Sequence, residues 1–147
     1  MRITKKTALT SIAGLTTTAV ATLVLAVPGT ANAASYWIGD CDVSAATSDP
    51  GANDMVGTLW RRNDASKHAY ASFKGKSETL YIYNKSGASM TFRFDWANGS
   101  RLEKSWDWTL RTGTSKTMDF DIPEGRTVIM GIGTPGGDAT SYCKGKA

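Results

Sequence analysis

Apolar and polar residues alternate along most of the chain beyond residue 78, and this period of two constrains the fold more than any other feature. One stretch places apolar side chains at every second position: Met90, Phe92, Phe94 and Trp96. The residues between them are polar or charged, so a strand here has one buried face and one wet face, as in antiparallel sheets. Helical periodicity is nearly absent after residue 34, and we therefore expect an all-β fold.

Turn-forming residues separate the alternating runs. Asn98-Gly99 is a strong hairpin signal, and further turns are indicated at Ser86-Gly87, Thr112-Gly113 and Pro123-Glu124-Gly125. We expect a meander of five strands in residues 78–133. Additional strands are expected over residues 36–38, 56–62, 67–74 and 140–143. About eight or nine short strands at this spacing are typical of an antiparallel β-sandwich, with a small β-barrel as the alternative.

The start of the chain has the features of a secretory signal peptide. Basic residues stand first, a dense apolar run follows over residues 19–27, and the small residues Ala31 and Ala33 suit cleavage before residue 34. The apolar run is much shorter than the roughly 20 residues that span a membrane. We therefore expect a signal peptide over residues 1–33, a single β-sandwich domain over residues 34–147, secretion, and no membrane anchor.

The two cysteines, Cys41 and Cys143, lie near the two ends of this expected domain. In an oxidising compartment an isolated pair usually forms a disulfide. The bridge closes a loop of about 100 residues, which the chain-entropy model values at about 4 to 5 kcal/mol. We expect it to tie the first strand of the domain to the last.

The charge balance argues against nucleic acid as a partner. The chain carries 17 Lys and Arg against 13 Asp and Glu, but three of the basic residues and no acidic residue lie in the expected leader. The remaining chain is close to neutral, so it lacks the basic surplus that phosphate binding requires.

Residues suited to catalysis or metal binding are scarce. His68 is the only histidine, and the expected disulfide uses both cysteines, so ligands for zinc or copper are missing. Asp119 and Asp121 share one face of a predicted strand, but we interpret them as charged sheet surface and not as a glycosidase pair, because a deep cleft is not indicated. We expect no enzyme, no metal and no cofactor.

Residues 42–54 form the one long irregular stretch that the sequence predicts, rich in Asp, Ser, Ala and Gly. Their oxygens are suited to calcium, but the spacing matches no EF-hand. We interpret the stretch as a solvated polar loop, with calcium or a protein partner as the alternatives.

Aromatic side chains are the most informative binding candidates. Most share the apolar phase of their strands, where core packing accounts for them. Tyr81 and Tyr83 instead alternate with the apolar residues of their strand, so they stand on the outside if those apolar residues face the core. Tyr70 extends this patch from the preceding strand, and Trp60 is a further candidate. The alternative is that a second sheet or a loop covers this face.

These features favour a secreted, non-catalytic binding protein whose partner is a carbohydrate or cell-wall polymer, because flat exposed aromatic rings stack on the apolar faces of sugars. The first alternative is a protein-directed effector, either an inhibitor of an extracellular enzyme or a small toxin, which presents residues 42–54 to its target. The second is a structural envelope or coat component. We expect a monomer or a weak homodimer.

Overall fold

The computed structural model describes residues 37–134, 136–137 and 140–147. The described residues form one 3-10 turn, η2 (Gly75–Ser77), and nine strands: β1 (Trp37–Ala45), β2 (Asn53–Arg61), β3 (Asp64–Lys74), β4 (Thr79–Asn84), β5 (Met90–Asn98), β6 (Arg101–Leu110), β7 (Thr114–Asp119), β8 (Thr127–Gly133) and β9 (Thr140–Lys146). The expected leader, residues 1–33, lies outside the described residues. Within the described part, no helix has the length and apolar character needed to cross a membrane.

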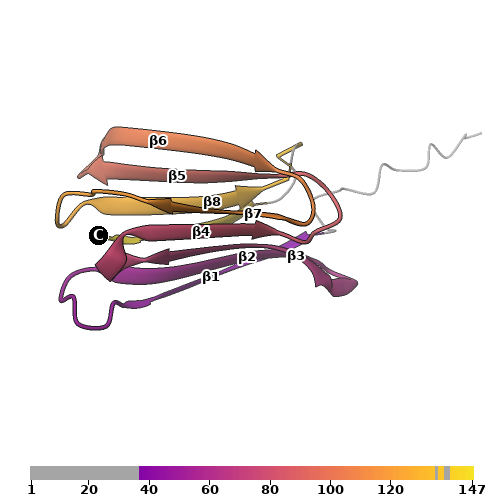
Figure 1. Ribbon diagram of the computed structural model, residues 1–147, viewed down its shortest axis with the longest axis horizontal. Helices are drawn as coiled ribbons and strands as arrows, with labels where there is room; N and C mark the ends of the chain where they lie inside the picture. Colours follow the sequence, from indigo (N-terminus) through magenta and orange to yellow (C-terminus); the bar gives the residue numbers. More distant parts are fainter. Residues whose placement is uncertain (1–36, 135, 138–139) are drawn as a thin grey trace, which may run out of the picture.

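The strands form two antiparallel sheets that stack as two layers (Figure 1). The five-stranded sheet has the order β1-β2-β3-β4-β7, and the four-stranded sheet has the order β6-β5-β8-β9. Each sheet keeps its own pair of edge strands, since no backbone ladder pairs a described strand of one sheet with a strand of the other. This arrangement confirms the predicted β-sandwich and excludes the barrel alternative, in which the sheet closes on itself.

The predicted meander over residues 78–133 is wrong in its pairing. β4 pairs with β7, and β8 pairs with β5, so the chain passes from one sheet to the other at three of the four predicted turns. Only the Asn98-Gly99 turn joins neighbouring strands of one sheet. Turn residues allow the chain to reverse, but they do not decide which sheet receives the next strand. Crossing between layers lets the apolar faces of both sheets bury each other.

A buried asparagine holds the first of these crossings in place. Asn84 at the end of β4 is fully buried, and its Nδ2 donates hydrogen bonds to the carbonyl oxygens of Ala88 and Leu110, each at 2.8 Å. Its Oδ1 accepts a hydrogen bond from the backbone N–H of Ser86 at 2.9 Å. The side chain thus satisfies the backbone of a corner that no sheet ladder reaches.

The predicted irregular stretch over residues 42–54 is also corrected. β1 continues to Ala45 and β2 begins at Asn53, so the connecting loop is confined to residues 46–52. β1 is an edge strand whose residues are mostly exposed on both faces, and it therefore lacks the alternation that marks the other strands. A hydrogen bond from the Ala46 N–H to the Ala52 carbonyl, at 3.0 Å, closes the loop.

The core lies between the two sheets and uses the apolar phase of each strand. The largest fully buried side chains include Phe73 and Leu80 of the five-stranded sheet and Phe92 and Phe94 of the four-stranded sheet. The rings of Phe73 and Phe94 meet across the layers with centroids 5.2 Å apart. Each such side chain contributes about 1.5 to 3 kcal/mol through burial, so the face turned inward by each strand is strongly specified.

The disulfide between Cys41 of β1 and Cys143 of β9 is confirmed, and it joins an edge strand of one sheet to an edge strand of the other. Beside it, Ser141 Oγ donates a hydrogen bond to the Asp40 carbonyl oxygen at 2.5 Å. The backbones are so close here that a Cβ added to Gly39 would lie 2.7 Å from the Thr140 carbonyl oxygen. This side of the sandwich is therefore closed by covalent, hydrogen-bonded and close backbone contact.

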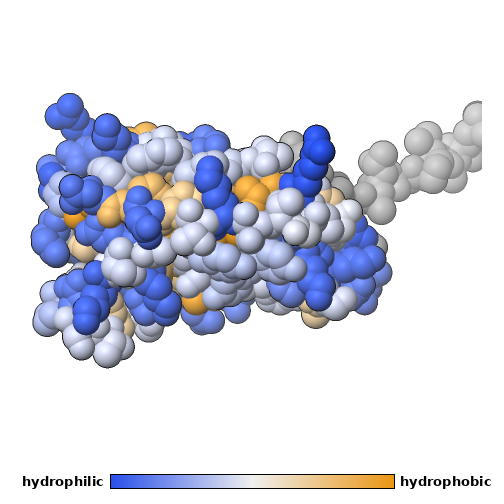
Figure 2. Space-filling model, in the orientation of Figure 1, coloured by the Kyte–Doolittle hydropathy of each residue, from blue (hydrophilic) through white to orange (hydrophobic). Residues whose placement is uncertain are grey.

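On the opposite side, between β6 and β7, packed side chains close the sandwich. Half-buried residues of these strands and of the segment after β7 pack against the core here: Trp106, Trp108, Met118 and Phe120. The rings of Trp106 and Phe120 have centroids 5.0 Å apart. Figure 2 shows apolar residues in a band along the middle of the molecule, between its two layers.

Candidate functional site

Three sequence-predicted residues, Tyr70, Tyr81 and Tyr83, lie together on the outer face of the five-stranded sheet, and we call this group the tyrosine face. Tyr70 of β3 and Tyr83 of β4 are cross-strand partners. Tyr81 is 39% exposed, whereas Tyr70 and Tyr83 are half-buried among their neighbours. The described residues build only two layers, and none of their strands packs over this outer face.

The tyrosines point outward because the residues that alternate with them are buried in the core. Leu80 and Ile82 of β4 are each 1% exposed, so the residues between and after them must face solvent. The same holds on β3, where Ala69 and Ala71 are fully buried on either side of Tyr70. The alternation noticed in the sequence therefore places the tyrosine face as predicted.

The rings of Tyr70 and Tyr81 have centroids 6.3 Å apart and are tilted by 57° to one another. They form two inclined surfaces and not a single flat platform. The cross-strand partners around them carry hydroxyls: Thr58 opposite Tyr70, Ser72 and Thr117 opposite Tyr81, and Ser115 opposite Tyr83. The centre of the face thus combines aromatic rings with neutral hydrogen-bonding groups and no charge.

Trp60 lies on the same outer face, one row away from the tyrosines. It is half-buried on β2, and its cross-strand partner is His68 of β3. His68 Nδ1 lies 3.2 Å from the Ala65 carbonyl oxygen, a local contact within its own strand. The structure therefore brings all four predicted aromatic residues to one face, with Trp60 at its margin.

An ion pair lies at the other end of this face. Lys74 Nζ and Asp54 Oδ2 are 2.9 Å apart, and the Gly75 N–H donates to Asp54 Oδ1 at 3.1 Å. The hydrogen bond to Asp54 raises the pKa of the Lys74 ammonium above its ordinary value, which keeps the lysine charged. Asp40 and Asp42 of β1 lie in the same rows of this face, opposite Thr58 and Val56, so charged groups border the tyrosines on the β1 side as well.

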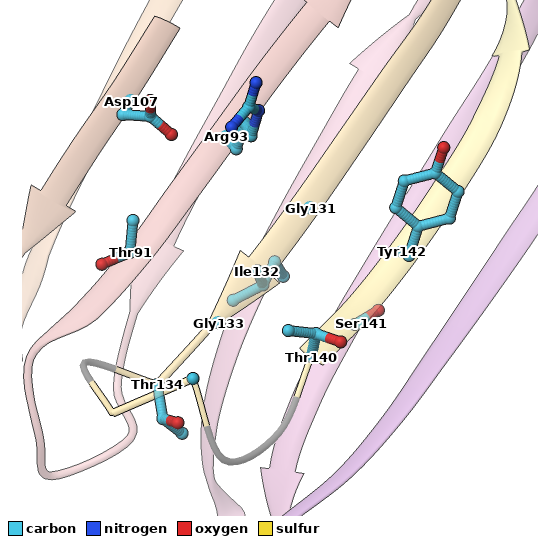
Figure 3. Close-up of a pocket in the computed structure, with 11 residues that line it drawn as sticks. Thr91, Arg93, Asp107, Gly131, Ile132, Gly133, Thr134, Thr140, Ser141 and Tyr142 are labelled. Atoms are coloured by element: carbon cyan, nitrogen blue, oxygen red, sulfur yellow. The ribbon is translucent and has the colours of Figure 1, made fainter.

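The four-stranded sheet carries a second concavity that the sequence analysis missed. A shallow hollow of about 400 Å³ lies on its outer face, and its walls include Arg93, Asp107 and Tyr142 (Figure 3). Gly131 lies between these walls, as the cross-strand partner of Arg93 on one side and Tyr142 on the other. Tyr142 is 58% exposed. We call these four residues and the space between them the glycine hollow.

A sequence signal for the glycine hollow does exist. Gly131 and Gly133 alternate with the buried Met130 and Ile132, which places two residues without side chains side by side on a wet face. Bare glycine on an otherwise regular strand marks a close approach of backbone or ligand. Tyr142, on the neighbouring strand, could not be placed beside it without the strand order.

The described residues hold no group of three or more His, Cys, Asp or Glu side chains that could bind a metal ion. Two of the oxygen-bearing residues near the 46–52 loop have separate partners: Asp54 is engaged by Lys74 and Gly75, and Asn53 Oδ1 accepts the Lys146 N–H at 2.9 Å. The prediction that Asp119 and Asp121 share one face of a strand is wrong, because β7 ends at Asp119 and Asp121 lies beyond it.

No protein-family model matches the sequence, and neither a curated protein nor a solved structure matches the chain. A fold by itself does not specify an activity, and the exposed surfaces of this protein are the features that bear on its function.

Proposed function

We propose that this protein is a secreted, non-catalytic binding protein that recognises a carbohydrate or cell-wall polymer through the tyrosine face. The observation that carries the proposal is a neutral group of tyrosine rings on a sheet face that no described strand covers. Sugar rings present apolar C–H faces that pack on aromatic rings, and they carry hydroxyls that need hydrogen-bond partners. The rings and the hydroxyl residues around them offer both.

The spacing of the tyrosines suits a polymer better than a single small sugar. Tyr81 and Tyr83 are two residues apart on β4, which corresponds to about 6.6 to 6.8 Å along a strand. One bound chain can therefore contact both positions. An open sheet face also lets a long polymer enter and leave at both ends.

The disulfide supports the extracellular part of the proposal. Disulfides persist in oxidising compartments and are rare in the cytosol, and Cys41–Cys143 joins the two sheets of this domain. The signal-peptide features of residues 1–33 agree with that location.

Retention on insoluble polysaccharides tests the proposal. The purified disulfide-bonded protein is incubated with cellulose, chitin and purified cell wall, and the bound fraction is compared with that of Tyr81→Ala/Tyr83→Ala. We expect the native protein to be retained on at least one of these, with an apparent affinity about tenfold higher than that of the variant, a loss of about 1.4 kcal/mol. Tyr81→Phe/Tyr83→Phe separates the rings from their hydroxyls, because it keeps the stacking surface.

Leu102→Ala is the matched control, since Leu102 is 51% exposed on β6 and belongs to neither candidate surface. It should bind like the native protein. Equal retention of native protein and the double alanine variant, or no retention of native protein on all three polymers, contradicts the proposal.

The 46–52 loop favours one second candidate function, that of a protein-directed inhibitor. The loop is closed by the Ala46–Ala52 hydrogen bond, and both alanines are buried while Pro50 and Gly51 at its tip are exposed. A loop held in this way is pre-organised to fit a partner's cleft. Under this alternative, Pro50→Ala weakens inhibition of a secreted hydrolase, while the double tyrosine variant leaves it unchanged.

A further inference from the structure

We propose that the glycine hollow is a second carbohydrate subsite, that it takes a neutral sugar unit, and that it lets one molecule hold two polymer segments at opposite faces. The ligand class rests on the proposed function, but the site is a different surface with different residues. Four features of the hollow carry the inference: its floor, its fixed donor and acceptor, its charge balance and its position.

The floor of the hollow is free of side chains. A Cβ added to Gly131 would lie 3.8 Å from the Ser141 carbonyl oxygen and 4.0 Å from Arg93 Cβ, which are ordinary contact distances. The backbone conformation and the packing therefore allow a larger residue at this position. Its absence leaves room beside Tyr142, whose ring is more exposed than any other large apolar or aromatic side chain in the described part of the protein. A ring-shaped ligand can lie over the glycine and against the tyrosine.

The opposite wall offers a donor that is already held in place. Arg93 Nε donates a hydrogen bond to Asp95 Oδ2 at 2.8 Å. Asp95 is only 6% exposed, and its other oxygen is buried without a hydrogen-bond partner among the described residues. This carboxylate raises the pKa of the Arg93 guanidinium above its ordinary value. Because the bond uses Nε, the two terminal NH₂ groups of Arg93 remain available to a ligand.

Asp107 supplies the matching acceptor. It is exposed on β6 and is the cross-strand partner of Arg93, so the two side chains stand next to each other at the rim (Figure 3). A sugar hydroxyl both donates and accepts hydrogen bonds. A neighbouring carboxylate and guanidinium can therefore bind adjacent hydroxyls of one ring.

The charge balance favours a neutral sugar over an acidic one. Among the described residues that line the hollow, the charged ones are one acid, Asp107, and one base, Arg93, and the base is already paired with Asp95. An acidic sugar would meet Asp107 without an unpaired base to compensate for it. A neutral sugar avoids this cost.

The position of the hollow makes the protein bivalent. The tyrosine face is the outer surface of the five-stranded sheet, the glycine hollow is on the outer surface of the four-stranded sheet, and the core separates them. One sugar unit cannot touch both surfaces. Two chains, or two distant segments of one chain, can be held at the same time, which raises avidity for an insoluble polymer.

The test measures binding of two neutral probes, cellohexaose and the hexamer of N-acetylglucosamine, and one acidic probe, polygalacturonate. Gly131→Val fills the hollow with a residue that strands favour, and Tyr142→Ala removes the ring. Thr127→Val is the matched control, because Thr127 lies on the same strand and the same outer face but does not line the hollow. Each substitution is made in the native chain and in the Tyr81→Ala/Tyr83→Ala chain, and the unfolding midpoint of each is checked against its parent.

We expect the double tyrosine variant to keep a residual affinity for a neutral hexamer. Gly131→Val and Tyr142→Ala each lower this residual affinity about tenfold, Thr127→Val leaves it unchanged, and polygalacturonate does not bind. We also expect the native protein to cross-link and aggregate fine particles of the polymer that it binds. Variants in which only one of the two surfaces is altered should still bind the particles but should no longer aggregate them.

The outcomes separate the two proposals. If both hollow variants bind like their parents, or if polygalacturonate binds the hollow better than the neutral hexamers, the second subsite is wrong while the tyrosine face stands. If the hollow variants abolish binding and the double tyrosine variant has no effect, the tyrosine face is wrong and the hollow is the principal site. Failure of the native protein to bind either hexamer overturns both.

Discussion

Tyr70 of β3 and Tyr83 of β4 are cross-strand partners on the outer face of their sheet, while the residues next to each of them in sequence face the core or its corner. The alternation of residues along β3 and β4 therefore gives each strand a core face and an outer face. The apolar phase holds the sheets together, and the tyrosine phase faces solvent. Stability and the proposed binding therefore depend on different residues of the same strands, so substitutions can separate them.

This separation predicts that substitutions at neighbouring positions of β4 change the free energy of unfolding by very different amounts. Leu80→Ala removes a buried side chain and should lower the free energy of unfolding by about 2 to 5 kcal/mol. Tyr81→Ala, at an exposed position, should change it by about 0.5 kcal/mol or less. Urea unfolding followed by tryptophan fluorescence measures both. A large loss of stability in Tyr81→Ala would show that this ring serves packing.

The disulfide is expected to provide a large share of the stability. It links residues 102 apart in sequence, and its loss restores the entropy of that loop to the unfolded chain. Cys41→Ala/Cys143→Ala should therefore lower the free energy of unfolding by about 4 kcal/mol. Reduction of the native protein provides an independent comparison, since it removes the same bond without a substitution. A loss below about 1 kcal/mol in either case would contradict this account.

Two glycines should respond differently to the same substitution. Gly39→Ala places a Cβ 2.7 Å from the Thr140 carbonyl oxygen, so β1 and β9 must move apart. We expect a loss of about 1 to 3 kcal/mol. Gly131→Ala meets only ordinary contacts and should be neutral or slightly stabilising, since alanine restricts the unfolded chain. Thermal unfolding compares the two variants, and an equal effect at both positions would be the contrary result.

A hydrogen-bonded carboxylate near the β2–β3 turn gives a pH-dependent prediction. Ser66 Oγ donates to Asp64 Oδ1 at 2.5 Å, and this bond lowers the pKa of Asp64 below its ordinary value. The bond stabilises the folded state at pH values above the ordinary carboxyl pKa, and this contribution is lost as the pH falls through the lowered value. Ser66→Ala should raise the Asp64 pKa, as measured by the carboxyl carbon shift during acid titration. An unchanged pKa would show that the serine is not the cause.

The alternation in the sequence predicted which face is buried in strands such as β4 and β5, but it did not predict which strands pair with one another. Leu80 and Ile82 alternate with Tyr81 and Tyr83, and the period of two alone places the tyrosines outside. The pairing of β4 with β7 depends on a corner in which buried Asn84 bonds to Ala88 and Leu110, a long-range contact that no local pattern encodes. β1 was underestimated in length because an exposed edge strand has no buried face to mark it.

The same limit explains the two candidate surfaces. The tyrosine face was predictable because Tyr81 and Tyr83 share one strand and Tyr70 lies on the strand before it. The glycine hollow joins Asp107 of β6, Arg93 of β5 and Tyr142 of β9, whose adjacency exists only once the strand order β6-β5-β8-β9 is known. Local alternation predicts which way a side chain points, whereas a site built across several strands requires the topology.

An NMR titration of the disulfide-bonded protein with cellohexaose and with the N-acetylglucosamine hexamer tests the central claim most directly. We predict that one of these sugars shifts the backbone amide signals of Tyr70, Tyr81 and Tyr83 in a saturable way, together with those of their cross-strand partners Thr58 and Ser115. The signals of Tyr70, Thr58 and Ser115 should move much less at the same sugar concentration in Tyr81→Ala/Tyr83→Ala. The absence of shifts on the tyrosine face with both sugars would contradict the claim that this face binds carbohydrate.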